Sequence, residues 1–264
     1  MKTIFYSHFA GNPYYNMAFD EWMFSNAIKN KASIYLRLYT WSQGSITFGL
    51  NQKKETALNF EKLNGTPIIR RITGGRALYH DLSELTYSIA INTDNLENNI
   101  FKGTHFNIFR AIADILVKFL GELGVCSDYI KQSSEQDLNK DIFHKTACFA
   151  SNAKYEIITD SQKIVASAQR CFENTIFQHG SIKINGLKTH PALTIKDLKC
   201  KNDKKIHSIT KKQFNNFVIC FEKVFSDLLE ASFQDIILSK VEENQIEKRI
   251  KYIKKKSTEK RDLF

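Results

Sequence analysis

RRITGGRALYHD, residues 70–81, is the stretch that decides how this chain is interpreted. Gly74 and Gly75 at its centre carry no Cβ, so the backbone can adopt positive φ and approach a ligand closely. Apolar residues 67–69 precede the run, and a strand-like segment, 85–92, follows it. Such a glycine turn, with Arg, Tyr and His beside it, suits a small acyl or phosphate-bearing ligand. A Gly-Gly pair by itself is weak evidence, because most such pairs are plain hairpin turns.

The segments around this turn alternate between strand and helix patterns. Strands are expected over residues 4–8, 33–39, 45–49, 155–158, 163–168 and 175–185, and helices over 13–30, 54–64, 104–124 and 214–229. The polar stretch 127–143 has no periodicity and is expected to be a loop. No repeat or Pro/Gly-rich linker divides the chain. We therefore expect one domain over residues 1–247, followed by a basic tail, 248–264.

Length and composition leave room for a soluble enzyme. A chain of 264 residues can bury a sizeable core. No window approaches the roughly 18 apolar residues of a membrane span, and residues 1–10 lack the apolar block of a signal peptide. The cysteines at positions 126, 148, 171, 200 and 220 are odd in number and have no CxxC spacing. This favours reduced thiols and a cytoplasmic location over a disulfide framework or a zinc site.

The positive charge is concentrated at the C-terminal end. The formal net charge is +10, and residues 248–261 hold eight Lys/Arg and one Glu, a net +7, which leaves about +3 for the rest. The overall charge would suggest a nucleic-acid partner, but the small charge of the rest of the chain does not support one. The basic run is interpreted as a solvated or frayed helix end. Steering of an acidic protein partner and loose contact with polyanions stay open as alternatives.

Cys148 is the leading candidate for a nucleophile. It follows the polar stretch and lies outside any periodic apolar stripe. A lone cysteine is more often a small buried apolar residue, and the other four cysteines keep that interpretation. Lys163 follows on a predicted hairpin that could turn back toward Cys148. A nearby ammonium that lowered the thiol pKa by about two units from about 8.5 would leave it mostly ionised. Without further context, Lys163 could equally be an exposed strand lysine.

Several segments in a particular order resemble one known family. They are residues 16–21 (NMAFDE), Arg37, Trp41, Gly49 and Gln52, the run 70–81, residues 148–150 (CFA), residues 163–169 (KIVASAQ) and residues 178–181 (QHGS). Together they are similar to the lipoate/octanoate transferase and lipoate protein ligase family, which is related to the biotin ligases. Lipoate ligases usually have a third glycine where Arg76 stands. A cysteine fifteen positions before the lysine, as Cys148 stands before Lys163, resembles the LipM-type octanoyltransferases.

The resemblance implies a fold and a reaction. The implied fold is α+β, with a mixed central β-sheet flanked by helices, as in the biotin/lipoate protein ligase catalytic domain and class II aminoacyl-tRNA synthetases. The implied reaction moves an octanoyl group from octanoyl-[acyl carrier protein] to a lysine of a lipoyl domain, such as glycine cleavage H protein. Cys148 would carry the group as a thioester, and Lys163 would lower the pKa of its thiol and polarise the acyl carbonyl. No cofactor would be required.

The resemblance also implies an acyl and substrate pocket. Its residues would be Arg71, Gly74, Gly75, Arg76, Tyr79, His80, Ala168, His179 and Gly180. His179 could equally be a structural hydrogen-bonding residue. Ala166 stands where the family's lysine motif usually has glycine, which could tighten the acyl tunnel or shift chain-length preference.

Two other functions stay open. An ATP- and Mg²⁺-dependent lipoate-protein ligase would use the same loop and Lys163, with Cys148 incidental; Arg76 and the lack of a large accessory region oppose it. A non-catalytic acyl- or nucleic-acid-binding module could instead use the basic tail. His144 and Cys148 have i,i+4 spacing but no further patterned ligands, so no metal site is expected.

Overall fold

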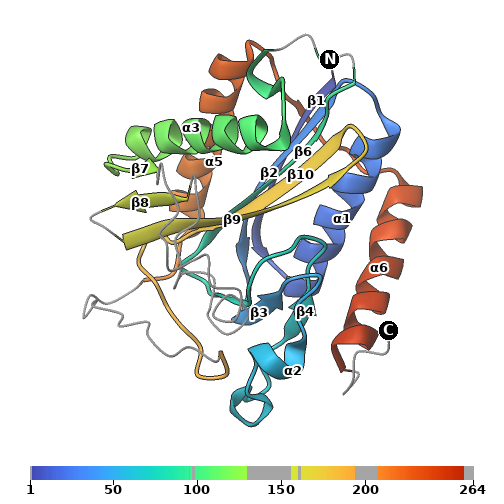
Figure 1. Cartoon of the computed structure of the whole chain (residues 1–264), viewed down its shortest axis with the longest axis vertical. Coiled ribbons are helices and arrows are strands. Elements are labelled where there is room, and N and C mark those ends of the chain that lie inside the picture. Colours follow the sequence, from blue (N-terminus) through green and yellow to red (C-terminus); the bar gives the residue numbers. More distant parts are fainter. Residues whose placement is uncertain are drawn as a thin grey trace.

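The structure is a computed structural model of the chain, and it describes residues 2–94, 96, 99–129, 156–159, 162–193 and 207–258. Its main element is a mixed β-sheet in the order β11-β1-β2-β6-β10-β9-β8-β7 (Figure 1). The strands are β1 Lys2–Gly11, β2 Ser33–Trp41, β6 Leu85–Asn92, β7 Asp128–Tyr129, β8 Ile157–Thr159, β9 Gln162–Phe172, β10 Thr175–Ile182 and β11 Gln234–Asp235. The pairs β11/β1 and β1/β2 are parallel, and the remaining pairs are antiparallel.

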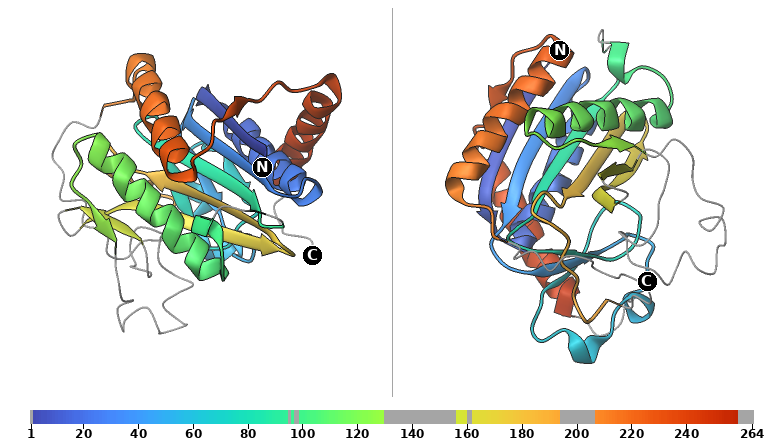
Figure 2. Two further views of the ribbon diagram at one scale, coloured as in Figure 1. Left: turned by 90° about the horizontal axis from the view of Figure 1, so that it is seen from above. Right: turned by 90° about the vertical axis from the view of Figure 1, so that its left-hand side faces the viewer.

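Helices cover both faces of this sheet (Figure 2). Helices α3 (His105–Glu122) and α5 (Lys211–Leu229) pack on one face, and α1 (Pro13–Lys29) and α6 (Lys240–Thr258) lie on the other. Strand β2 is buried along its whole length. Its aliphatic side chains at even positions join the α3/α5 core, whereas Tyr35 and Tyr39 join the α1/α6 core. Alternate side chains of β2 therefore point into two different apolar cores, and neither face of the strand is exposed to solvent.

Local signals explain where the long helices begin. Asn12 caps α1 by accepting a hydrogen bond from the backbone N–H of Tyr14, and Pro13 occupies the first turn, where its missing N–H costs nothing. Thr104 is the N-cap residue of α3 and Thr210 that of α5, and each forms a reciprocal capping box. The helices expected over 13–30, 104–124 and 214–229 are thus confirmed.

A smaller sheet in the order β4-β3-β5 packs beside the large one. It contains β3 Ser45–Phe48, β4 Ile68–Arg70 and β5 Leu78–His80, with β4 parallel and β5 antiparallel to β3. The glycine run of residues 71–77 connects β4 to β5. The small sheet therefore holds this loop from both ends.

The helix expected over residues 54–64 is wrong in its extent. Helix α2 is short (Lys54–Ala57), and a separate 3-10 turn occupies Phe60–Lys62. Leu58 between them has extended backbone angles and forms a β-bridge with Leu193. This pairing with a residue distant in sequence overrides the local helical preference.

The C-terminal basic residues continue a packed helix. Helix α6 lies along α1 and runs to Thr258, with Ile246 and Ile253 buried in the shared core. The expected division at residue 247 falls inside this helix, and residues 259–264 lie outside the described part of the chain. Among the described helices, none combines the length and the apolarity that crossing a membrane requires.

Candidate active site

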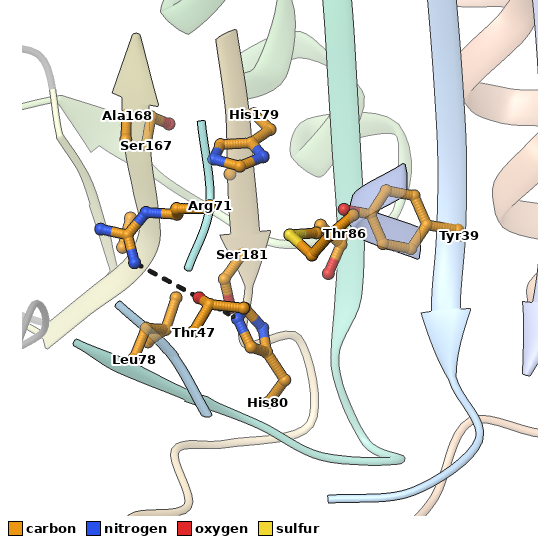
Figure 3. Close-up of a pocket in the computed structure, with 13 residues that line it drawn as sticks. Tyr39, Thr47, Arg71, Leu78, His80, Thr86, Ser167, Ala168, His179 and Ser181 are labelled. Carbon is orange, nitrogen blue, oxygen red and sulfur yellow. Dashed lines mark hydrogen bonds between the residues drawn. The ribbon is translucent and has the colours of Figure 1, made fainter. Parts of the chain in front are cut away.

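A cavity lies between the α1-side face of the large sheet and the small sheet (Figure 3). Strands β6, β9 and β10 contribute Thr86, residues 166–168 and residues 179–181, and the small sheet contributes Thr47, Leu78 and His80. Met17 of α1, Tyr39 of β2 and Arg71 complete the lining. The empty space is about 350 Å³, its mouth included.

Strand register determines which side chains form the cavity floor. Ser181 pairs with Thr86 on β6 and with Ala166 on β9, so these three residues lie side by side across the sheet. Two residues earlier on β10, His179 pairs with Ala168. Because side chains two residues apart on a strand share a face, both rows face the same cavity.

Arg71 holds the glycine loop in its shape. Its guanidinium donates to the carbonyl oxygens of Gly74 (2.7 and 3.1 Å) and Arg76 (2.8 Å). Gly75 has φ +88°, and a Cβ there would lie 2.9 Å from Arg71 Nη2. A Cβ on Gly49 would lie 2.0 Å from the carbonyl oxygen of Gly75. The loop conformation therefore requires glycine at two positions that are far apart in sequence.

His179 is held from both sides of its ring. Its Nε2 lies 2.7 Å from Thr73 Oγ1, and its Nδ1 lies 3.1 Å from Asp20 Oδ2. Asp20 also accepts hydrogen bonds from Arg37 (2.8 Å), Ser88 and Tyr39. Burial alone would raise the pKa of Asp20, but these hydrogen bonds and the charge of Arg37 lower it overall. Asp20 is therefore an ionised carboxylate that accepts hydrogen bonds from several buried side chains next to the cavity.

His80 is held in the same manner. Its Nε2 lies 2.8 Å from Thr47 Oγ1, its Nδ1 lies 2.7 Å from Glu84 Oε1, and its ring stacks on Trp41. Burial opposes ionisation of Glu84, but its hydrogen bond with His80 and the charge of Lys183, whose Nζ is 2.5 Å away, lower the Glu84 pKa to about 2. Glu84 is therefore ionised at neutral pH.

The carboxylates of Asp20 and Glu84 determine which ring nitrogen of His179 and His80 carries the proton. An ionised carboxylate only accepts hydrogen bonds, so Nδ1 of each histidine carries the proton that it donates to Asp20 or Glu84. Burial lowers the pKa of both imidazoles, which leaves them neutral at pH 7, with Nε2 as an acceptor. Thr73 and Thr47 then donate to Nε2. Since both nitrogens of each ring are engaged, the geometry suits these histidines to shaping the wall more than to abstracting a proton.

The structure places the predicted binding residues in the cavity lining and in the glycine loop, except for Tyr79. Arg71, His80, Ala168, His179 and Gly180 all line the cavity. Gly74, Gly75 and Arg76 lie in the loop behind Arg71, and the carbonyl oxygens of Gly74 and Arg76 accept its hydrogen bonds. Tyr79 is not part of the lining: it lies between Leu78 and His80 on β5, and its ring packs against His190 instead. The binding roles of these residues stay predictions.

Of the two predicted catalytic residues, only Lys163 lies within the described part of the chain. Cys148 lies outside the described residues. Lys163 is buried on β9, in the hairpin with β8 that the sequence predicted, and its Nζ lies 2.5 Å from Glu156 Oε1. Strand β9 continues from Lys163 to the cavity-lining residues 166–168.

Several residues of the site were not identified from the sequence. Asp20 lies in the segment 16–21 that carries the resemblance, but no local pattern relates it to His179. Ser181 follows His179 by two residues in a predicted strand, and this spacing could have placed both on one face. For Thr47, Thr73, Glu84 and Glu156, the sequence offers no comparable signal, because their partners are set by tertiary contacts.

Comparisons with known sequences point to one family. Residues 12–241 match the lipoyl protein ligase A/B catalytic domain. An octanoyltransferase LipM of Clostridioides difficile (strain 630) is 37% identical over 172 residues, which are 63% of this chain and 60% of the relative. An octanoyltransferase LipM of Exiguobacterium sp. is 28% identical over 257 residues, 91% of each chain. The first of these matches spans less than two thirds of the relative's own length, and so does a match of 31% identity to the octanoyltransferase LipM of Brevibacillus brevis, which spans 63% of it.

Solved structures share the fold. A crystal structure of lipoate-protein ligase A bound with ATP has a TM-score of 0.69 at 19% identity and covers 95% of both chains. A putative lipoate protein ligase from T. acidophilum with bound lipoic acid has a TM-score of 0.67 at 20% identity and covers 96% of both. The expected α+β fold, a mixed central sheet flanked by helices as in biotin/lipoate ligases, is confirmed.

Proposed function

The chain belongs to the family of the lipoyl protein ligase A/B catalytic domain, and on that premise we propose that it is an octanoyltransferase of protein lipoylation. It moves an octanoyl group from octanoyl-[acyl carrier protein] to a lysine of a lipoyl domain, such as glycine cleavage H protein, in the cytoplasm. The observation that carries the proposal is the cavity. It brings Ala168 of β9, the strand that also bears Lys163, and His179 and Gly180 of the neighbouring β10 together with Arg71 and His80 from the small sheet and its loop. The names of the curated relatives support the octanoyl group as cargo.

The proposed reaction has two steps. In the first, the Cys148 thiolate attacks the thioester carbonyl carbon; a bond from Cys148 Sγ to that carbon forms, and the carrier's thiolate leaves and takes up a proton. In the second, the ε-amine of the acceptor lysine attacks the same carbon. An amide forms, the amine loses a proton, and the Cys148 thiol is regenerated. Exchange of one thioester for another is nearly isoenergetic and amide formation is downhill, so the cycle needs no ATP and no other cofactor.

The chain's residues have distinct tasks in this cycle. The Lys163 ammonium lies on the strand that borders the acyl pocket, where it lowers the pKa of the Cys148 thiol and stabilises negative charge on the acyl oxygen. The neutral imidazoles of His80 and His179 form part of the cavity wall without adding charge to it. Ala166 and Ala168 supply a small apolar floor on β9.

Intact mass spectrometry tests this function directly. The protein is mixed with octanoyl-[acyl carrier protein] without ATP, and then with a lipoyl-domain acceptor. An octanoyl adduct on the wild type, absent from Cys148→Ser and discharged by the acceptor, is the expected result. Modification of the acceptor that requires ATP, Mg²⁺ and free acid would instead establish the lipoate-protein ligase and overturn the transferase.

A further inference from the structure

Lys163 and Glu156 form a buried ion pair at one end of the cavity-lining strand. Lys163 Nζ lies 2.5 Å from Glu156 Oε1, and the two side chains are 3% and 8% exposed. Glu156 immediately precedes β8, and Lys163 is the second residue of β9. These strands pair antiparallel, so the hairpin itself brings the carboxylate to the ammonium.

The backbone around the pair is irregular. Ile157 pairs with Val165, whereas Ile158 pairs with Lys163, so the shift in register leaves Ile164 as an extra residue on β9. Such a bulge bends its strand and redirects the neighbouring side chains. Here it separates Lys163 at the start of β9 from the regular stretch that contributes residues 166–168 to the cavity.

Stability alone is a weak reason to bury these two charges. Removing an ammonium and a carboxylate from water costs about as much as their attraction returns, and apolar side chains of similar volume often stabilise a fold equally well. A lysine side chain also has several rotatable bonds whose freedom is lost when its end is fixed. What the pair supplies beyond stability is a defined position for one ammonium group.

Resting on the proposed function, we infer that Glu156 is a positioning residue, which holds the Lys163 ammonium where it faces the reacting acyl group. An ammonium carries three N–H donors, so its bond to Glu156 is compatible with donation to an acyl carbonyl oxygen. The chemistry requires the cation to be in place before the substrate arrives, because reorganising it during the reaction would cost rate. In this role Glu156 acts on the reaction through Lys163.

Three variants of Glu156 test the contributions of its charge, its side-chain length and its packing separately. Glu156→Gln keeps the shape and removes the charge, Glu156→Asp keeps the charge and shortens the side chain, and Glu156→Ala removes both. Thr159→Val is the matched control, because the Thr159 hydroxyl anchors the same strand β8 through a hydrogen bond to the carbonyl oxygen of Cys126 and forms no hydrogen bond with Lys163 in the described part of the chain. Each protein is compared with wild type in thermal unfolding and in steady-state transfer from octanoyl-[acyl carrier protein].

For Glu156→Gln we expect kcat to fall roughly 10- to 100-fold, the scale of a misplaced catalytic group, with KM within about twofold of wild type. Glu156→Asp should recover part of kcat, and Thr159→Val should match wild type. A merely structural role would lower the unfolding temperature of Glu156→Gln and Thr159→Val together and leave the kcat of the folded fraction unchanged. That outcome overturns the inference.

A second readout does not depend on activity. In protein labelled with ¹⁵N-lysine, an immobilised and hydrogen-bonded ammonium gives an observable ¹H–¹⁵Nζ signal, which Lys163→Met identifies by its loss. We expect this signal in wild type and in Glu156→Asp, and its disappearance in Glu156→Gln. Its persistence in Glu156→Gln overturns the inference. If wild type shows no octanoyl transfer, the proposed function fails, and the signal still decides whether Glu156 positions Lys163.

Discussion

His179 Nδ1 on β10 lies 3.1 Å from Asp20 Oδ2 on α1, a contact between residues 159 positions apart in sequence. The same carboxylate pairs with Arg37 on β2, whose side chain is fully buried. With the hydrogen bond from Ser88 of β6, one acidic side chain therefore joins the helix to three strands of the sheet and fixes the orientation of an imidazole in the cavity wall.

Asp20→Asn should destabilise the protein strongly. The substitution leaves the Arg37 charge buried without its counter-ion, and breaking a buried pair in this way costs about 3–5 kcal/mol. Denaturant unfolding measures the loss. Asp114→Asn, in the exposed pair with Arg110, is the control and should cost less than about 1 kcal/mol. Similar losses in both variants would contradict the role of Asp20 as a buried counter-ion of Arg37.

The two neighbouring glycines of the loop should respond differently to alanine. Gly75→Ala places a Cβ at positive φ and 2.9 Å from Arg71 Nη2, so we expect a loss of about 1–2 kcal/mol and slower octanoyl transfer. At Gly74 a Cβ would meet nothing within 4 Å and φ is not positive, so Gly74→Ala should change stability by less than about 1 kcal/mol. Urea unfolding and transfer rates of the pair test this; equal effects would refute the loop geometry.

Glu84 should make stability depend on pH in the acid range. Its pKa is about 2 in the folded protein against an ordinary value of 4.5, so the folded state binds fewer protons between these values. The contribution is therefore complete above about pH 4.5 and is lost as the pH falls toward 2. Unfolding free energies measured across this window should fall less steeply for Glu84→Gln. An unchanged slope would show that other groups cause the acid dependence.

Ser181 should tolerate loss of its hydroxyl better than Thr86 does, although the two residues are neighbours in the cavity floor. Ser181 Oγ is buried and has no hydrogen-bond partner among the described residues, so Ser181→Ala should be neutral or stabilise by up to about 1 kcal/mol. Thr86 accepts from Trp41 Nε1 and donates to Glu84, so Thr86→Val should destabilise by about 1–3 kcal/mol. Chemical denaturation of both variants decides the matter, and a costly Ser181→Ala would mean that the hydroxyl has a partner.

Much of the architecture follows from short-range patterns. The spacing of apolar residues and the caps at Asn12, Thr104 and Thr210 locate the long helices within a few residues. The alternation in residues 33–39 identifies a strand, because side chains of a strand point to opposite faces over any short length. The glycine run likewise predicts a tight loop, since the positive φ angles that glycine permits depend only on the local backbone.

The amino-acid sequence by itself determined the elements, the glycine loop and the residue types available for acyl chemistry, all of which depend on interactions over a few positions. Tertiary structure alone decided the break at Leu58, the partners of His80 and His179, and the pairing of Lys163 with Glu156. Strand order and register bring these groups together, and a pattern along the chain does not encode which strands become neighbours. Burial then turns those contacts into lowered pKa values and fixed orientations, because charges and polar groups removed from water interact mainly with the partners the fold provides.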